Sequence, residues 1–79
     1  MSNLPKLNNG TIEVRLDGKY FDHFKFEIMD NSSVIVWDRE EYWAHYSDFA
    51  ETMIRILDYF NENYRRYGVF SLIITGVNE

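Results

Sequence analysis

The chain has 79 residues, which is room for one hydrophobic core and excludes a second domain. Its hydrophobic share of 46% excludes a disordered chain, and the absence of cysteine excludes disulfides and thiolate zinc sites. A net charge of −5 argues against partners that carry phosphate and favours partners with a basic surface. We therefore treat residues 1–79 as a single domain.

The first ten residues contain Pro5 and an Asn-Asn-Gly run, so we expect residues 1–10 to form an irregular N-terminal arm. No basic segment followed by an apolar one is present there, and no apolar run approaches the roughly 18 residues of a membrane span. The expected location is the cytoplasm, without membrane association.

Three strands are predicted before any helix. Residues 11–16 and 23–28 each alternate apolar with polar side chains, which is the pattern of a strand with one buried face. Residues 30–33 are turn formers, and the continuous apolar run 34–37 predicts a third, short strand.

The connection between the first two strands depends on register. A two-residue turn at Asp17-Gly18 would direct Phe24 and Phe26 away from the apolar face of the first strand. We therefore predict a longer loop or bulged turn over residues 17–21. The register that keeps the apolar side chains together has two pairs: Val14 with Phe24 and Ile12 with Phe26.

Apolar residues then recur at spacings of three and four, which predicts an amphipathic helix. They are Tyr42, Tyr46, Phe49, Met53, Leu57, Phe60, Tyr64 and Tyr67. Asp38 opens one capping pattern and Ser47 another, and a helix continuous over both would be about 43 Å long. We favour a short helix or turn at residues 39–45 and a main helix at 47–66, followed by a last strand at 69–75.

The predicted fold is thus α+β, in the order β-β-β-α-β, with an antiparallel sheet of about four strands packed on one main helix. Residues 38–62, which include most of that helix, hold seven acidic side chains and two arginines. We expect its acids to form one solvent-facing surface that attracts basic proteins. They are Glu40, Glu41, Asp48, Glu51, Asp58 and Glu62.

No catalytic constellation is evident. Cysteine is absent, the two histidines are separate in sequence, and no nucleophile motif accompanies the serines, so we expect no enzyme activity. Glu41, His45 and Asp48 would share one face of a continuous helix and could hold a metal there. Acids at a helix start are more simply explained by the helix dipole, so neither a metal nor another cofactor is expected.

Nucleic acid and nucleotides are not expected as direct ligands. The four glycines are isolated, so no glycine-rich phosphate loop exists. The basic residues near the first hairpin are offset by neighbouring acids, which leaves no basic groove beside the aromatic side chains.

Aromatic side chains exceed what one small core needs. Four of them are candidate anchors for a partner: Tyr20, Phe21, Tyr42 and Trp43. One helix covers one face of a sheet, so three further apolar residues are expected on the opposite face: Ile35, Trp37 and Ile73. The N-terminal arm, a second copy of the chain or a foreign partner could cover that face.

In size, acidity and content of Tyr and Trp, the chain resembles the small phage-encoded inhibitors of bacterial defence systems, of which anti-CRISPR proteins are the best known. The resemblance is one of overall profile and rests on no motif. It implies a stoichiometric inhibitor, acting in the cytoplasm of a bacterial host, whose carboxylates occupy a basic nucleic-acid channel or docking surface on the target.

The alternative is a structural or adaptor subunit, including an immunity protein or antitoxin. Such a protein would use the face with Ile35, Trp37 and Ile73 to form a homodimer or to join a host complex. Both hypotheses describe a binding protein, and they differ in the surface that binds.

Overall fold

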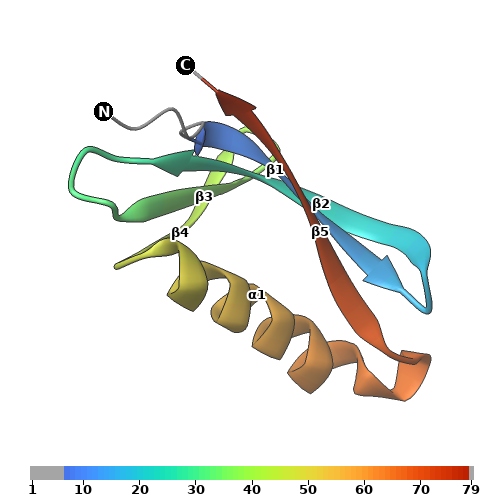
Figure 1. The fold of residues 1–79 in the computed structure, drawn as a ribbon. Coiled ribbons are helices and arrows are strands. Elements are labelled where there is room, and N and C mark those ends of the chain that lie inside the picture. The colour runs from blue at the N-terminus through green and yellow to red at the C-terminus, as the bar shows by residue number, and fades with distance from the viewer. Residues whose placement is uncertain (1–6, 79) are drawn as a thin grey trace.

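Residues 7–78, which the computed structural model describes, build two layers (Figure 1). One layer is an antiparallel sheet of five strands, and the other is a helix that packs across one face of it. The elements in chain order are β1 (Leu7–Leu16), β2 (Lys19–Ile28), β3 (Val34–Asp38), β4 (Glu41–Tyr46), α1 (Phe49–Tyr64), the short 3₁₀ helix η1 (Arg65–Tyr67) and β5 (Phe70–Asn78). The strands lie in the order β4-β3-β2-β1-β5. The predicted α+β class is confirmed, with one strand more than expected.

β1 begins earlier than predicted. The irregular arm expected for residues 1–10 is wrong from Leu7 onward, and its first six residues lie outside the described part. Gly10 lies within the ladder, paired to β2 on one side and to β5 on the other. A Cβ at Gly10 would collide with the carbonyl oxygen of Thr75 and come within 2.9 Å of the Phe26 ring, so glycine allows this close approach of strands.

Two residues connect β1 to β2. Leu16 pairs with Lys19, and between them Asp17 and Gly18 have φ values of 51° and 82°. Positive φ at both central positions is the type I′ arrangement, whose twist matches that of the flanking strands. Of the two alternatives predicted for residues 17–21, the longer loop is therefore wrong, whereas a bulge is present within this range.

A bulge in β2 reconciles this tight turn with the apolar pattern. Phe21 has no partner on β1, because the register shifts between Val14 and Arg15. One extra residue on a strand reverses the face of the side chains that follow, so Phe24 and Phe26 return to the buried face. The observed pairs differ from the predicted ones: Ile12 with Phe24 and Gly10 with Phe26.

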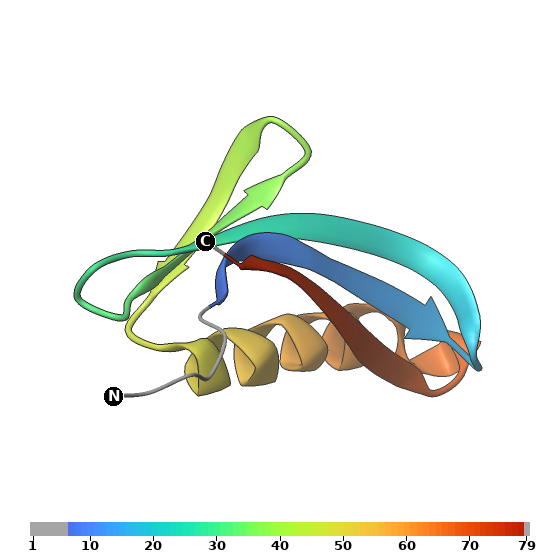
Figure 2. The ribbon, with the colours of Figure 1, turned by 45° about the horizontal axis from the view of Figure 1, so that its top comes forward.

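Residues 41–46 form β4, so the short helix or turn predicted at 39–45 is wrong. Arg39 has a φ of 60° and lies in the two-residue turn between the paired Asp38 and Glu41. The chain therefore reverses direction and β4 pairs with β3. Tyr and Trp favour strands as readily as a helix face, so their spacing alone does not separate the two. Figure 2 shows this turn standing away from α1.

The second of the two predicted helix starts is the one that forms. Asp48 is the N-cap of α1, and its Oδ1 accepts a hydrogen bond of 2.7 Å from the N–H of Glu51. Glu51 Oε1 in turn accepts bonds from the N–H of Ser47 at 3.0 Å and from its hydroxyl at 2.7 Å. These reciprocal bonds satisfy N–H groups that would otherwise lack partners at the helix start.

The core lies between α1 and the sheet face that α1 covers. Phe60, near the C-terminal end of α1, contacts the rings of Phe21, Phe24 and Phe70 at centroid distances of 5.8, 5.9 and 5.6 Å. The buried hydrophobic residues are Ile12, Val14, Phe24, Phe26, Val34, Val36, Ile56, Phe60 and Phe70. The predicted apolar stripe is therefore confirmed from Phe49 to Tyr64. It is wrong for Tyr42 and Tyr46, which belong to β4, and for Tyr67, which is exposed on η1.

The cap makes stability depend on pH. The hydrogen bonds from the Ser47 N–H and hydroxyl, with Arg55 nearby, lower the pKa of Glu51 below its ordinary value of 4.5. A lowered folded-state pKa gives stability that is present above about pH 4.5 and lost as pH falls through the folded-state pKa. We expect Glu51→Gln to be less stable than the wild type at neutral pH and to lose less stability between neutral and acidic pH, measured by urea unfolding.

Glu40→Gln is the matched control, because Glu40 is exposed and makes no hydrogen bond or ion pair within residues 7–78. It should keep the wild-type dependence. Parallel pH profiles for Glu51→Gln and the wild type would contradict the assigned role of this cap.

Candidate functional site

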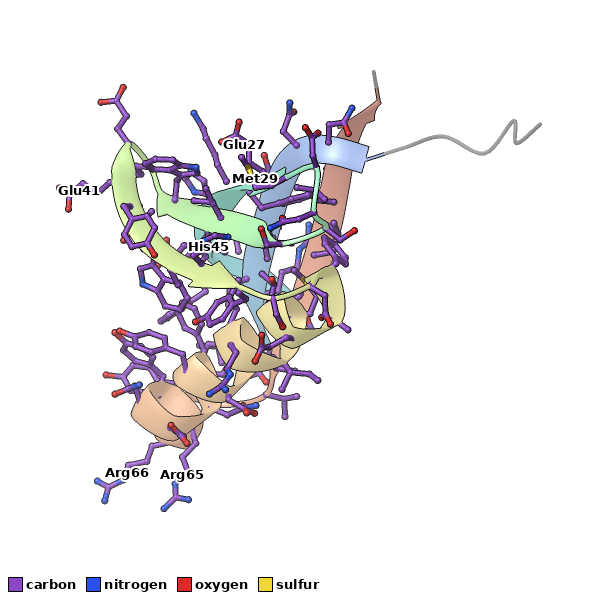
Figure 3. The ribbon with its side chains drawn as sticks, turned by 90° about the vertical axis from the view of Figure 1, so that its left-hand side faces the viewer. Glu27, Met29, Glu41, His45, Arg65 and Arg66 are labelled. Carbon is purple, nitrogen blue, oxygen red and sulfur yellow. The ribbon has the colours of Figure 1, made fainter. Side chains whose placement is uncertain are left out.

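The predicted acidic face separates into groups. Glu40 and Glu41 lie at the turn between β3 and β4, away from the helix, and Figure 3 shows Glu41 at the outer end of that hairpin. Both side chains are exposed. The expectation that all six acids share one helical surface is therefore wrong for these two, because residues 39–46 form a hairpin turn and a strand.

The carboxylates of Asp48 and Glu51 form hydrogen bonds that cap the start of α1. Asp48 accepts the capping hydrogen bond, and Glu51 accepts two bonds from Ser47. Glu51 Oε2 also lies 3.4 Å from a guanidinium nitrogen of Arg55. These carboxylates contribute to the negative field, but their hydrogen-bonding capacity is largely satisfied within the chain.

Asp58 and Glu62 remain as exposed carboxylates with no hydrogen bond or ion pair in the described part of the chain. They are four residues apart on α1, which places them on the same side of the helix. They line a groove between α1 and β4, which we call the acidic groove. Its residues are Trp43, Ala44, Tyr46, Arg55, Asp58, Tyr59 and Glu62.

Aromatic rings form the wall of the acidic groove on the sheet side. A bulge at Trp43, where the register shifts between Val36 and Trp37, gives this residue no partner on β3. Its ring contacts Phe24 at 5.0 Å and the 40% exposed Tyr59 at 5.5 Å. Trp43 thus joins the core to the groove.

Tyr46 also lines the groove. Burial raises the pKa of its phenol, and the charge of Arg55 acts in the opposite direction. The phenol is therefore neutral at physiological pH, and Arg55 is the only cation among the residues of the acidic groove.

The four predicted aromatic anchors lie in different places. Phe21 packs into the core against Phe60 and Tyr64, so its prediction as an exposed anchor is wrong. Tyr20 is 58% exposed at one end of the β1–β2 hairpin, where its hydroxyl lies 2.6 Å from His23 Nδ1. The other two are separated by the β4 bulge: Trp43 faces the groove, and Tyr42 contacts Trp37.

Pairing places Ile35, Trp37 and Ile73 on the sheet face opposite α1. Trp37 pairs with Lys25 of β2, which pairs in turn with Thr11 of β1. β1 and β2 therefore separate the first two residues from Ile73 on β5. Their polar side chains interrupt the apolar patch that the homodimer hypothesis requires, although Ile73 itself is 42% exposed.

One contact could not be foreseen from the sequence. His45 Nε2 lies 2.9 Å from Ser33 Oγ, a pairing that two neighbouring strands create across 12 positions. The Ser33 hydroxyl donates to Asn31 Oδ1, which also accepts the N–H of Ser33. The Ser33 side chain therefore contacts both Asn31 and His45 and closes the β2–β3 turn.

The proposed metal face does not exist, because Glu41 and His45 are on a strand and Asp48 caps the helix. Within residues 7–78, no three His, Asp or Glu side chains gather closely enough to hold a metal ion. In the same range, no helix has both the length and the apolar composition needed to cross a membrane.

Comparisons with protein-family models, curated proteins and solved structures find no match. The functional argument therefore rests on the side chains themselves. Among the predicted site residues, the structure brings together Asp58, Glu62 and Trp43, and it adds Tyr59, whose place in the helical pattern gave no sign of a role at the groove.

The β4 bulge predicts different roles for two adjacent aromatic residues. Trp43→Ala should lower the free energy of unfolding by about 2 to 3 kcal/mol, since the ring is half-buried against the core. Tyr42→Ala should cost less than about 1 kcal/mol, since Tyr42 is 62% exposed. Urea unfolding of both variants checks this, and equal losses would mean that the bulge does not direct Trp43 inward.

Proposed function

We propose that this protein is a non-catalytic binding protein that docks its acidic groove onto a basic surface of another protein. The pair Asp58 and Glu62 carries the proposal. These exposed carboxylates lie one helical turn apart, have no partner within residues 7–78, and border the rings of Trp43 and Tyr59. The groove beside Trp37 has one acid of this kind, Glu27, whereas the acidic groove has two.

The groove has the chemistry to bind arginine or lysine. Two carboxylates at this spacing can both accept hydrogen bonds from one guanidinium group, and charge-assisted bonds of this kind are stronger than neutral ones. The Tyr59 face adds a site for a cation over an aromatic ring. The ion pair of Glu51 and Arg55 lies at the surface and contributes little to stability. A cation of the partner can therefore compete with Arg55 for Glu51.

The chain's negative field supports fast association with a basic partner. The net charge is −5, and carboxylates at both the acidic groove and the β3–β4 turn add to the field. Such fields raise association rates and weaken as salt shortens the Debye length, which is about 8 Å at physiological ionic strength. All of these acids would therefore contribute to the long-range attraction, whereas only those of the acidic groove would make the specific contact.

We further propose that the bound protein is a nucleic-acid-binding or defence complex of a bacterial cell, and that this chain inhibits it stoichiometrically. Lysines and arginines that hold phosphate would be occupied by the carboxylates of the groove. This is the mode of action that the resemblance to small phage-encoded inhibitors implies. The alternative of an adaptor subunit, immunity protein or antitoxin acting through Ile35, Trp37 and Ile73 has less support, because β1 and β2 separate those residues.

The test is a pull-down from bacterial lysate at about 50 mM and about 500 mM salt, with mass-spectrometric identification of the captured protein. The expected result is a nucleic-acid-binding protein that wild-type bait retains at low salt and releases at high salt. Asp58→Lys/Glu62→Lys should lose it. In a gel-shift assay with that protein, one equivalent of wild-type chain should displace its nucleic acid.

The matched control is Glu40→Lys/Glu41→Lys, which reverses the same number of charges at the β3–β4 turn. It should slow association moderately through the weaker field but retain the partner. Equal losses for the two double variants would reduce the proposal to a nonspecific charge effect, and a salt-insensitive complex would refute the acidic groove as its binding site.

A further inference from the structure

β5 is an open edge of the sheet. It pairs with β1 on one side, and no strand formed by residues 7–78 pairs with it on the other. Its nine residues therefore present a row of backbone N–H and C=O groups without strand partners. An extended chain added there would complete the hydrogen-bonding pattern of the sheet.

β5 lacks the features that keep sheet edges apart. From Phe70 to Asn78 it has no charged residue and no proline, and it faces outward with Ser71, Ile73 and Thr75. The opposite edge, β4, is different: it has six residues, a bulge and the charge of Glu41. Short length, bulges and charges protect edge strands, so only the β5 edge is unprotected.

The side of α1 next to β5 is also uncharged. All four charged residues of α1 recur at intervals of four, three and four, which is one stripe along the helix. They are Glu51, Arg55, Asp58 and Glu62. The residues that immediately precede these four form a second, uncharged stripe: Ala50, Ile54, Leu57 and Asn61. The charged stripe runs on the side of the acidic groove, and the uncharged stripe runs on the side of β5.

An apolar groove lies between the two uncharged elements. Met53, Ile54 and Leu57 of α1 line it together with Leu72 and Ile74 of β5. Ile54 is 59% exposed and lies beside the other apolar side chains of this groove, so the apolar surface is contiguous there. We call β5 and these three helix residues the β5 seam.

We propose that the β5 seam binds a second copy of this chain. A twofold axis perpendicular to the sheet would run β5 antiparallel to its copy and keep both helices on the same face. The backbone edges would then pair, and the apolar grooves would form one continuous core beneath the joined sheets. The same patch serves both copies, as a twofold interface requires.

Charge and area both favour a second copy as the occupant. Two chains of charge −5 repel each other, so association is favoured where neither presents acids, and the β5 seam meets that condition within residues 7–78. A strand of nine residues is about 30 Å long, and the combined depth of sheet and helix is about 20 Å. Each copy would therefore bury about 600 Å², close to the lower limit for a specific interface.

Sedimentation of the full chain over the micromolar range tests the proposal. The wild type should dimerise, and more tightly at about 500 mM than at about 50 mM salt, because salt screens repulsion between the copies. This dependence is opposite to that expected for the acidic groove, so the two proposals can fail separately. Outward-facing amides of β5 should exchange with solvent more slowly as protein concentration rises.

Two variants each place a positive charge in the β5 seam, one on its helix side and one on its strand side. Ile54→Lys and Thr75→Lys alter exposed side chains, so the fold should persist, as circular dichroism would verify. Each should raise the dimer Kd about tenfold or more. The control Glu40→Gln changes the net charge by the same one unit and should leave the dimer intact.

Three results would overturn the proposal. One is a wild-type chain that stays monomeric across the range, which would also leave a foreign strand as the candidate occupant of the edge. Another is a dimer that both lysine variants leave unchanged. The third is a dimer that Trp37→Ala dissociates while Ile54→Lys does not, since Trp37 lies on the sheet face opposite α1.

Discussion

One helix must cover a sheet of five strands, and this constraint determines most of the molecule. Five strands at about 4.8 Å spacing span more than the diameter of one helix, which is about 10 Å. α1 therefore covers the middle of one sheet face and leaves a groove on each side. The groove toward β4 is the acidic groove, and the groove toward β5 belongs to the β5 seam.

Two bulges supply the side chains that the helix alone cannot provide. The bulge at Phe21 sends its ring to Phe60 and Phe70, and the bulge at Trp43 sends its ring to Phe24 and Tyr59. Both residues would otherwise follow the alternation of their strands. The sheet thus widens its core by adding one aromatic residue on each side of α1, and the second of these rings becomes the wall of the acidic groove.

The sequence predicted a strand or helix correctly where its pattern of apolar residues fits only one kind of element. Strict alternation identified β1 and β2, and the helical repeat identified α1 from Phe49 to Tyr64. Residues 41–46 have two interpretations, because aromatic residues four and three apart fit a helix as well as a strand followed by a turn. The reversal at Arg39 decided between them, and its positive φ is not evident from an arginine in the sequence.

Local sequence patterns could not predict the positions of the two bulges, for a related reason. A register is chosen by the total burial of both strands, so the extra residue at Phe21 is favoured by contacts with α1 and β5, far along the chain. The same applies to the candidate site. Asp58 and Glu62 were predicted because the helix contains them, whereas their neighbours Trp43 and Tyr46 come from β4, most of which local reasoning had assigned to a short helix or turn.

The segregation of charge on α1 gives its two grooves different chemistry. A shift of one residue along the helix changes direction by about 100°, so acids and apolar residues on adjacent stripes face different sides of the molecule. A dimer joined at β5 would leave both acidic grooves at its outer sides, with their aromatic walls uncovered. It would also present two grooves to a partner that has two basic sites, and linked binding of this kind strengthens attachment without any new contact. The two proposed surfaces are therefore compatible, because the helix keeps their chemistries apart.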